Sequence, residues 1–277
     1  MDFYKETVPI LEDSSQCRDV LNPQDAVKGY VERDYAVYPQ EMFAQPDQMN
    51  LIPASEYDAR YDEQEQQQSS LEHIYLANGG QPIFTNLDQN GNGYCWSYSN
   101  GHCIMMVRAA NNQPLIRLNP HATAAIIKGG RDEGGWCGLS AKFGREFGYA
   151  VEGNEPGQWP KHSRDLRYDT AVLRENMSKH KILEDWVDMT KQIYDQNLTK
   201  NQLATALFNN QPCAVDFNFW SHSVCGIRWV RLEAGSWGLL ILNSWLGWGR
   251  FGLAVLRGSQ SIPDGAVCLR TTGASVS

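Results

Sequence analysis

The sequence predicts an α+β protein in which a helical half is followed by an antiparallel β half. Helical patterns recur between residues 95 and 208, and from residue 213 the pattern changes to short apolar runs separated by Gly, Ser and Arg. Residues 1–70 differ from both halves in composition: they are acidic, rich in Gln and Tyr, and interrupted by prolines. We therefore expect an N-terminal extension over residues 1–70 and a two-lobed domain over 71–277. Its helical lobe would cover about 71–210 and its β lobe about 211–277, with a cleft between them.

The extension contains one helical signal. Ser55 and Asp58 are spaced as a capping box, and few apolar residues follow before Leu71 and Ile74. The pattern predicts a helix that is exposed to solvent.

Four segments of the helical half have helical character. Residues 95–110 contain no proline and end at Asn111 and Asn112, while residues 140–147 end at Gly148. Residues 181–196 and 199–208 predict two more helices, the second with Thr199 and Gln202 as a capping box.

Four apolar runs predict the strands of the β half. They are CAVDFNFW, SVCGIRWV, WGLLILNSW and FGLAVLRG, at residues 213–220, 223–230, 237–245 and 251–258. Their shortness and the residues between them favour an antiparallel sheet.

Composition excludes several classes of protein. The chain has 277 residues, of which 42% are hydrophobic, so it can bury a core, and its net charge of −8 would repel nucleic acid. No apolar run is long enough to cross a membrane, and the first twenty residues do not resemble a secretory signal. Seven cysteines are scattered without a CxxC pair. We expect reduced thiols in an intracellular, cytoplasmic protein.

Cys95 stands out by its position. The glycine-containing loop of residues 89–94 delivers it to the first turn of the predicted helix. A helix start carries a partial positive charge and unpaired N–H groups, which favour a thiolate and can bind an oxyanion. His222 and Asn243 follow 127 and 148 residues later on predicted strands, a spacing typical of Cys-His-Asn enzymes.

Four motifs together resemble the papain-like cysteine peptidases over residues 71–257, in a form without disulfides such as bacteria or phages encode. The matching residues are Gln89, Cys95 and Trp96; His222, Ser223 and Val224; Asn243, Ser244 and Trp245 with the glycines after them; and Gly134, Gly135 and Trp136. The resemblance implies a two-lobed fold that needs no cofactor or metal and acts on a protein or peptide.

The resemblance also implies roles for these residues. His222 would take the proton of Cys95 so that a thiolate and imidazolium coexist near neutral pH, and Asn243 would orient the imidazole. Trp245 would shield that contact, and Gln89 would join the Cys95 N–H in an oxyanion hole. Gly134, Gly135, Trp136 and Trp220 would border the bound substrate.

Two departures from the family pattern are informative. Positions where a disulfide is usual hold Asn92 and Glu133, as a reducing compartment would favour. The chain before His222 is short, and Trp220 with Ser221 stands where the family shapes a second substrate pocket, so specificity does not carry over.

Two metal signals are weak. Residues 88–93 match the opening of a calcium loop, but Ser99 stands where a glutamate is required. His102 and Cys103 are adjacent on a predicted helix and point apart, which favours core packing.

Two functions stay open at this stage: thiol-dependent hydrolysis of peptide or isopeptide bonds, and a structural or docking role, for example in a virion, with little activity. A peptidoglycan amidase is a third candidate, which the Asn-Ser-Trp motif disfavours. The extension could be a proregion that covers Cys95, or an arm whose tyrosines lie on the flank or reach a partner protein. We favour the arm because of its polar Gln run. Its tyrosines are Tyr30, Tyr35, Tyr38, Tyr57 and Tyr61.

Overall fold

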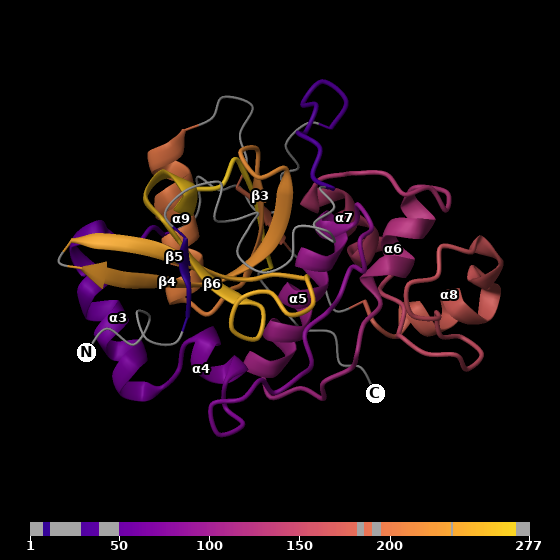
Figure 1. Cartoon of the computed structure of the whole chain (residues 1–277), viewed down its shortest axis with the longest axis horizontal. Coiled ribbons are helices and arrows are strands. Elements are labelled where there is room, and N and C mark those ends of the chain that lie inside the picture. Colours follow the sequence, from indigo (N-terminus) through magenta and orange to yellow (C-terminus); the bar gives the residue numbers. More distant parts are fainter. Residues whose placement is uncertain are drawn as a thin grey trace.

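The computed structural model describes residues 8–11, 29–38, 50–181, 186–189, 195–233 and 235–269. The helices of residues 120–178 and the sheet form two lobes side by side, with one long helix, α5 (Cys95–Ala110), between them, and the helices of residues 57–75 lie on the side of the sheet (Figure 1). The predicted α+β architecture is confirmed. In the part of the chain just defined, no helix is both long enough and apolar enough to span a bilayer.

The helical lobe contains α5, α6 (Pro120–Ile127), α7 (Cys137–Glu146) and α8 (Ala171–Ser178). Helix α5 has the predicted bounds, and α7 begins three residues before the predicted start at residue 140. Helices α6 and α8 were not predicted, although each has a side-chain cap: Asn119 accepts from the Ala122 N–H and Thr170 from the Leu173 N–H. A short 3-10 helix, Leu166–Tyr168, precedes α8.

All four predicted strands are present. Seven strands lie in the order β1-β6-β5-β4-β3-β7-β2 among the described residues. The bounds are β1 Ile10–Leu11, β2 Trp186–Asp188, β3 Cys213–Phe217, β4 His222–Glu233, β5 Ser236–Leu242, β6 Leu253–Arg257 and β7 Gly265–Leu269, with a 3-10 helix at Gly258–Ser261. All neighbouring strands are antiparallel except β1 and β6.

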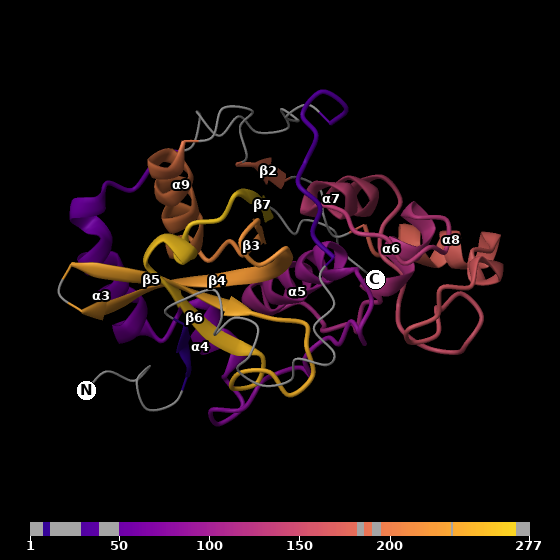
Figure 2. The same ribbon diagram turned by 45° about the horizontal axis from the view of Figure 1, so that its top comes forward.

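The helix predicted over residues 181–196 is wrong at its centre. Trp186–Asp188 forms β2 and pairs with β7 at the end of the sheet (Figure 2). An open sheet edge satisfies the backbone groups of this segment, and this tertiary pairing overrides local helix propensity. Residues 182–185 and 190–194 lie outside the described residues.

Both predicted capping boxes are wrong, although both helices exist. A 3-10 turn, Ala54–Glu56, precedes α3 (Tyr57–Gln67), which has no side-chain cap. Helix α9 (Gln196–Phe208) starts earlier than predicted, because the Asp195 side chain accepts from the Leu198 N–H. The intervening α4 is Leu71–Tyr75.

Parts of the N-terminal extension are built into the β lobe. Ile10 and Leu11 add a parallel strand beside β6. Helix α3 is not simply solvated, because Tyr57 and Tyr61 are buried with ring centroids 5.7 and 5.9 Å from that of Trp237 on β5. These aromatic contacts supply the packing that the apolar pattern of α3 lacks.

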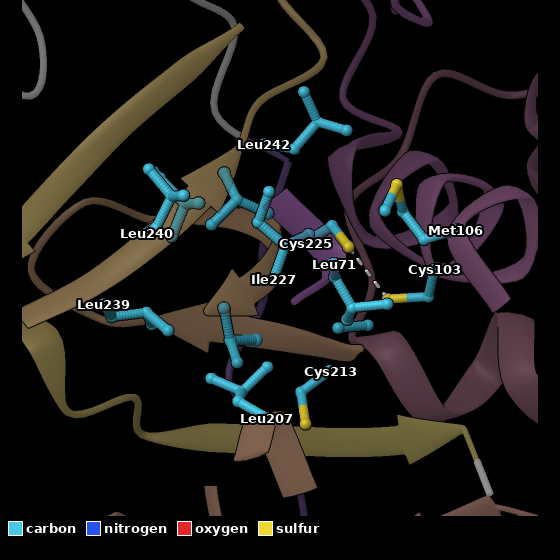
Figure 3. Packing of buried hydrophobic residues seen from close by; sticks show 14 of the residues in the cluster. Leu71, Cys103, Met106, Leu207, Cys213, Cys225, Ile227, Leu239, Leu240 and Leu242 are labelled. Atoms are coloured by element: carbon cyan, nitrogen blue, oxygen red, sulfur yellow. Dashed lines mark hydrogen bonds between the residues drawn. The ribbon is translucent and has the colours of Figure 1, made fainter. Parts of the chain in front are cut away.

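One hydrophobic core joins the two lobes. Cys103 and Met106 of α5 face Leu71 and Cys225, and the remaining side chains drawn belong mostly to the sheet (Figure 3). A smaller cluster, which includes Phe143, lies under α6, α7 and α8. Because α5 is packed on both sides, its first residue is fixed at the boundary between the lobes.

Candidate active site

Cys95 occupies the first position of α5 and is completely buried. The preceding residue, Tyr94, offers no side-chain cap, so the first N–H groups of the helix are left for other partners. Positive φ angles at Asn90 and Gly91 let the loop turn sharply before the helix. The structure therefore holds the Cys95 thiol at the N-terminus of α5, as the sequence motif predicts.

His222 and Asn243 meet at the neighbouring ends of β4 and β5. The His222 Nε2 is 2.8 Å from the Asn243 Oδ1, which also accepts from the Ser244 N–H at 2.8 Å. Since this oxygen can only accept, Nε2 carries the proton and Nδ1 presents its lone pair. The arrangement orients a neutral imidazole as a base.

Aromatic rings enclose this pair. The Trp245 ring stacks on the imidazole with centroids 4.3 Å apart, and the Trp220 ring meets it at 4.8 Å. Trp220 is fully buried in this cluster and also contacts Trp245. Both rings keep water from the contact between His222 and Asn243.

Gln89 is fixed beside the start of α5. Its Oε1 accepts from the Ser244 Oγ at 2.8 Å, its backbone N–H donates to the Ser244 carbonyl, and its Nε2 donates to the Asn92 carbonyl. The Asn-Ser-Trp motif thus holds both the histidine partner and the glutamine.

Cys95 and His222 are not joined as an ion pair. The His222 Nδ1 is buried without a hydrogen-bond partner among the described residues. Burial raises the pKa of Cys95 to about 12, although hydrogen bonds from Ser223 and from the Gly29 backbone lower it. Burial likewise lowers the pKa of His222 to about 4. Burial therefore favours a neutral thiol and a neutral imidazole over the expected thiolate and imidazolium, because the charged forms lose their contact with water.

A segment of the N-terminal extension covers Cys95. The Tyr30 N–H donates to the Ser221 carbonyl at 3.2 Å, the Val31 N–H donates to the Gly135 carbonyl, and the Gly135 N–H donates to the Gly29 carbonyl, both at 2.9 Å. Residues 29–38 descend beside α7 toward the start of α5 (Figure 2). We call residues 29–31 the covering segment.

The covering segment fits closely. A Cβ atom on Gly29 would lie 2.2 Å from the Gly93 carbonyl oxygen, and one on Gly134 would lie 2.6 Å from the Gly29 oxygen. Only glycine permits such an approach. The segment and the cleft are therefore matched backbone to backbone.

The tyrosines of the extension do not all agree with one alternative, the proregion over Cys95 or the arm on the flank. Tyr30 is bonded to Ser221, next to His222, and not to the flank, so the flank expectation is wrong for this residue, whereas Tyr57 and Tyr61 lie on the flank against Trp237. The Tyr38 ring approaches that of Trp136 with centroids 6.0 Å apart.

The predicted substrate loop lies on the other side of the covering segment. A Cβ atom on Gly135 would lie 2.8 Å from the ring of Trp96. Trp136 is the N-cap of α7 and carries the guanidinium of Arg33 over its ring at 4.1 Å. Gly134 and Gly135 therefore contact the covering segment, and Gly135 also lies against Trp96, the residue after Cys95.

The described residues form no group of three or more His, Cys, Asp or Glu that could hold a metal ion. The His102 Nε2 accepts from the Leu87 N–H, and burial lowers the pKa of His102 to about 3. The Cys103 Sγ lies 3.2 Å from the Cys225 Sγ. None of the six described cysteines forms a disulfide, and Cys17 lies outside the described residues.

Sequence reasoning missed Asp216, Ser223 as a partner of Cys95, and Gly29. Asp216 is buried next to the cleft and accepts from the Ser223 Oγ. An aspartate in the middle of the apolar run CAVDFNFW was the available signal, because a buried carboxylate needs a specific reason. Gly29 gave no signal, since its contacts are more than sixty residues away.

No protein-family model and no curated protein matches the chain. Solved structures do match it. Xylellain, a cysteine protease from Xylella fastidiosa, aligns with a TM-score of 0.57 and 14% identity over 89% of this chain and 97% of its own. A structure from a comparison of the mite allergens Blo t 1 and Der p 1 gives 0.51 and 16% over 68% and 67% of the two chains. Procathepsin L 3 of the Tenebrio molitor larval midgut gives 0.49 and 15% over 77% and 88%. The chain has the two-lobed papain-like fold that the sequence predicted.

Proposed function

We propose that the protein is a cysteine peptidase with Cys95 as nucleophile, His222 as base and Asn243 as the residue that orients it. The observation that carries the proposal is the covering segment itself. A stretch of polypeptide lies over Cys95, held by backbone hydrogen bonds to Gly135 on one side and Ser221 on the other. Such bonds bind a peptide main chain whatever its side chains, as a peptidase requires.

The chemistry follows from the positions of the groups. His222 Nδ1 takes the proton from the Cys95 thiol, and the sulfur attacks the carbonyl carbon of the bound peptide. As the C–S bond forms, the carbonyl electrons move to oxygen, where the Gln89 amide and the Cys95 N–H stabilise the negative charge. His222 returns its proton to the leaving nitrogen as the C–N bond breaks. Water, deprotonated by His222, then hydrolyses the thioester.

The amide of an isopeptide bond presents the same carbonyl, so the same steps apply to it. What the cleft accepts depends on which side chains fit beside the peptide backbone.

The covered arrangement is a latent form in this proposal. Cys95 is fully buried, and the covering segment runs parallel to the strand-like stretch at Gly135. Displacement of the segment admits water, which lowers the cost of charging both groups and brings their pKa values toward neutrality. The proregion alternative is thereby favoured for residues 29–31.

A structural or docking protein is the second candidate, and the same burial favours it. If the segment never leaves the cleft, the thiol stays neutral and the fold serves as a scaffold.

The test is thiol labelling by a peptidyl epoxide, located by mass spectrometry, together with turnover of a peptide mixture. Gly29→Val should label at least about tenfold faster than the wild type, because overpacking against Gly93 costs about 1–3 kcal/mol and drives the segment out of the cleft. Val37→Ala is the matched control, since Val37 is in the same part of the chain and exposed. Cys95→Ala should abolish labelling and turnover, and His222→Ala should reduce both nearly as much.

Two results would contradict the proposal. One is equal labelling of several cysteines in the folded protein. The other is peptide turnover that survives Cys95→Ala. Circular dichroism of each variant separates these results from loss of the fold.

A further inference from the structure

The side chain of Tyr30 occupies a pocket next to Cys95. Its backbone is fixed between Ser221 and Gly135, and its phenol is close enough to Asp216 and Cys137 for their charges to act on it. Tyr30 is half-buried and packs against the main core. We call the space that this side chain fills the Tyr30 pocket.

The wall of the Tyr30 pocket contains a buried carboxylate. Asp216 of β3 is 2% exposed and lies opposite Ser223 of β4. The Ser223 Oγ and the Cys137 Sγ donate to its Oδ1, the latter at 3.0 Å, and the Cys137 N–H reaches its Oδ2 at 3.3 Å. Ser223 and Cys137 each lie two residues beyond the hydrogen-bonding partners of the covering segment, which puts Asp216 beside Tyr30.

A second carboxylate completes the wall. Asp264 precedes β7, donates its N–H to the Asp216 carbonyl at 2.9 Å, and accepts from the Asn218 N–H at 2.7 Å. Gly265, which pairs with Asp216 across the ladder, has no side chain to fill the space. Two acids therefore stand at a pocket that a glycine leaves open.

The charge of this pocket is not balanced by its occupant. Burial, then Asp216 and Asp264, raise the pKa of the Tyr30 phenol, which stays neutral. Burial also raises the pKa of Asp216 to about 6 and that of Asp264 above its ordinary value, and in the described part of the chain the charges that add to these shifts are those of acids, Asp264 and Glu32. Tyr30 fills the space and brings no positive charge to it.

We propose that the Tyr30 pocket is a specificity pocket that selects a lysine or arginine side chain of the substrate. The inference rests on the proposed peptidase function and adds to it the class of substrate. A cationic side chain in the place of Tyr30 gains the attraction of both carboxylates, and in a buried site this attraction is weakly screened. The neutral Tyr30 makes the covering segment a poorer ligand than such a substrate, so the segment can be displaced.

The experiment is a positional scan with peptidyl epoxides on the full-length protein. Arg, Leu or Glu is placed at one position at a time, and the rate of Cys95 labelling is measured near pH 7.5. We expect one position at which Arg labels at least about tenfold faster than Leu, with Glu the slowest, a ratio that corresponds to about 1.4 kcal/mol. No such preference is expected at the other positions.

Two variants test whether the carboxylates are responsible. Asp264→Asn is the milder change, since its amide oxygen can still accept from Asn218, and Asp216→Asn removes the buried charge. Each should bring the ratio of Arg to Leu labelling close to one, and because both probes are compared on the same variant, the ratio is independent of any change in the absolute labelling rate. Asp58→Asn is the matched control, because it removes one exposed negative charge that pairs with Arg231 on the flank.

The outcomes distinguish a failure of the charge preference from a failure of the peptidase proposal. If Leu probes label Cys95 as fast as Arg probes at every position, this inference is wrong and the peptidase proposal stands. If the preference persists in both Asn variants, the pocket is not its source. If no peptide probe labels Cys95 in the wild type or in Gly29→Val, while iodoacetamide does so in Gly29→Val, the peptidase proposal fails and the inference falls with it.

Discussion

Two groups of carboxylates lie near β4, and the partners of the two groups differ. Glu65 and Glu72 meet the buried Arg228, whose Nη1 is 2.7 Å from the Glu72 Oε2 and whose Nη2 donates to Glu65. Among the described residues, Asp216 and Asp264 have hydrogen-bond donors as partners, and the charges that act on them are those of acids, Asp264 and Glu32. The first group is partly neutralised by a buried cation, and the second has no such cation in the part of the chain that the structure describes.

The difference in partners indicates that the two groups of carboxylates have different roles. Arg228 ties α3 and α4 to β4, so its ion pairs join the N-terminal helices to the sheet. A fold that needed Asp216 only for stability could have supplied a cation there as well, since an unpaired buried charge is costly. We expect a cationic ligand to compensate that charge.

The largest expected effect is at the neutralised group. Arg228→Met should lower the free energy of unfolding by about 3–5 kcal/mol, because it leaves the buried Glu72 without its cation. Urea denaturation measures the change. The double variant Arg228→Met with Glu72→Leu should regain most of the loss, and a single variant that loses less than about 1 kcal/mol would contradict this role.

The second effect is on stability at Asp216. Its folded pKa of about 6 lies above its ordinary value of 3.8, so the native state holds a proton that the unfolded state has lost between these values. The contribution of Asp216 to stability therefore falls as pH rises from about 4 to 6, by about 2–3 kcal/mol, and is constant above. Asp216→Asn should remove this part of the pH dependence in urea denaturation at pH 4 and pH 7. An unchanged slope would mean that Asp216 ionises normally.

The third effect is on selectivity. Protonation of Asp216 below about pH 6 removes one of the three carboxylate charges that act on Tyr30, the others being those of Asp264 and Glu32. The ratio of Arg to Leu labelling should therefore fall severalfold between pH 7.5 and 5, while iodoacetamide labelling controls for the thiol itself. A ratio that stays constant would contradict a role for Asp216 in charge recognition.

The smallest effect is expected on the exposed flank. Arg231 pairs with Asp58 and Asp62 of α3 at 3.0 and 2.7 Å, but both acids are largely exposed. Arg231→Ala should cost less than about 1 kcal/mol, and the loss should shrink in high salt. A loss as large as that of Arg228→Met would show that burial is not what distinguishes the two arginines.

Much of the site could be predicted from local signals. The start of α5 at Cys95, the strand that begins at His222 and the strand that ends before Asn243 each follow from a pattern within about ten residues. The loop of Gly134 and Gly135 was expected from the resemblance to papain-like peptidases. The helix over residues 181–196 was mispredicted because its periodicity resembled a helix while an open sheet edge was available to Trp186–Asp188.

The sequence by itself determined the order of the lobes, the helix that presents Cys95 and the residues able to act with it, because these depend on periodicity and on motif spacing. Only the tertiary structure decided that Gly29 approaches Gly93, that Ile10 pairs with Val255, and that Asp216 lies beside Tyr30. Each of these contacts joins residues more than sixty positions apart and depends on backbone groups or on charges in a buried site. No local pattern encodes such a contact, since its energy exists only after the chain has closed around it.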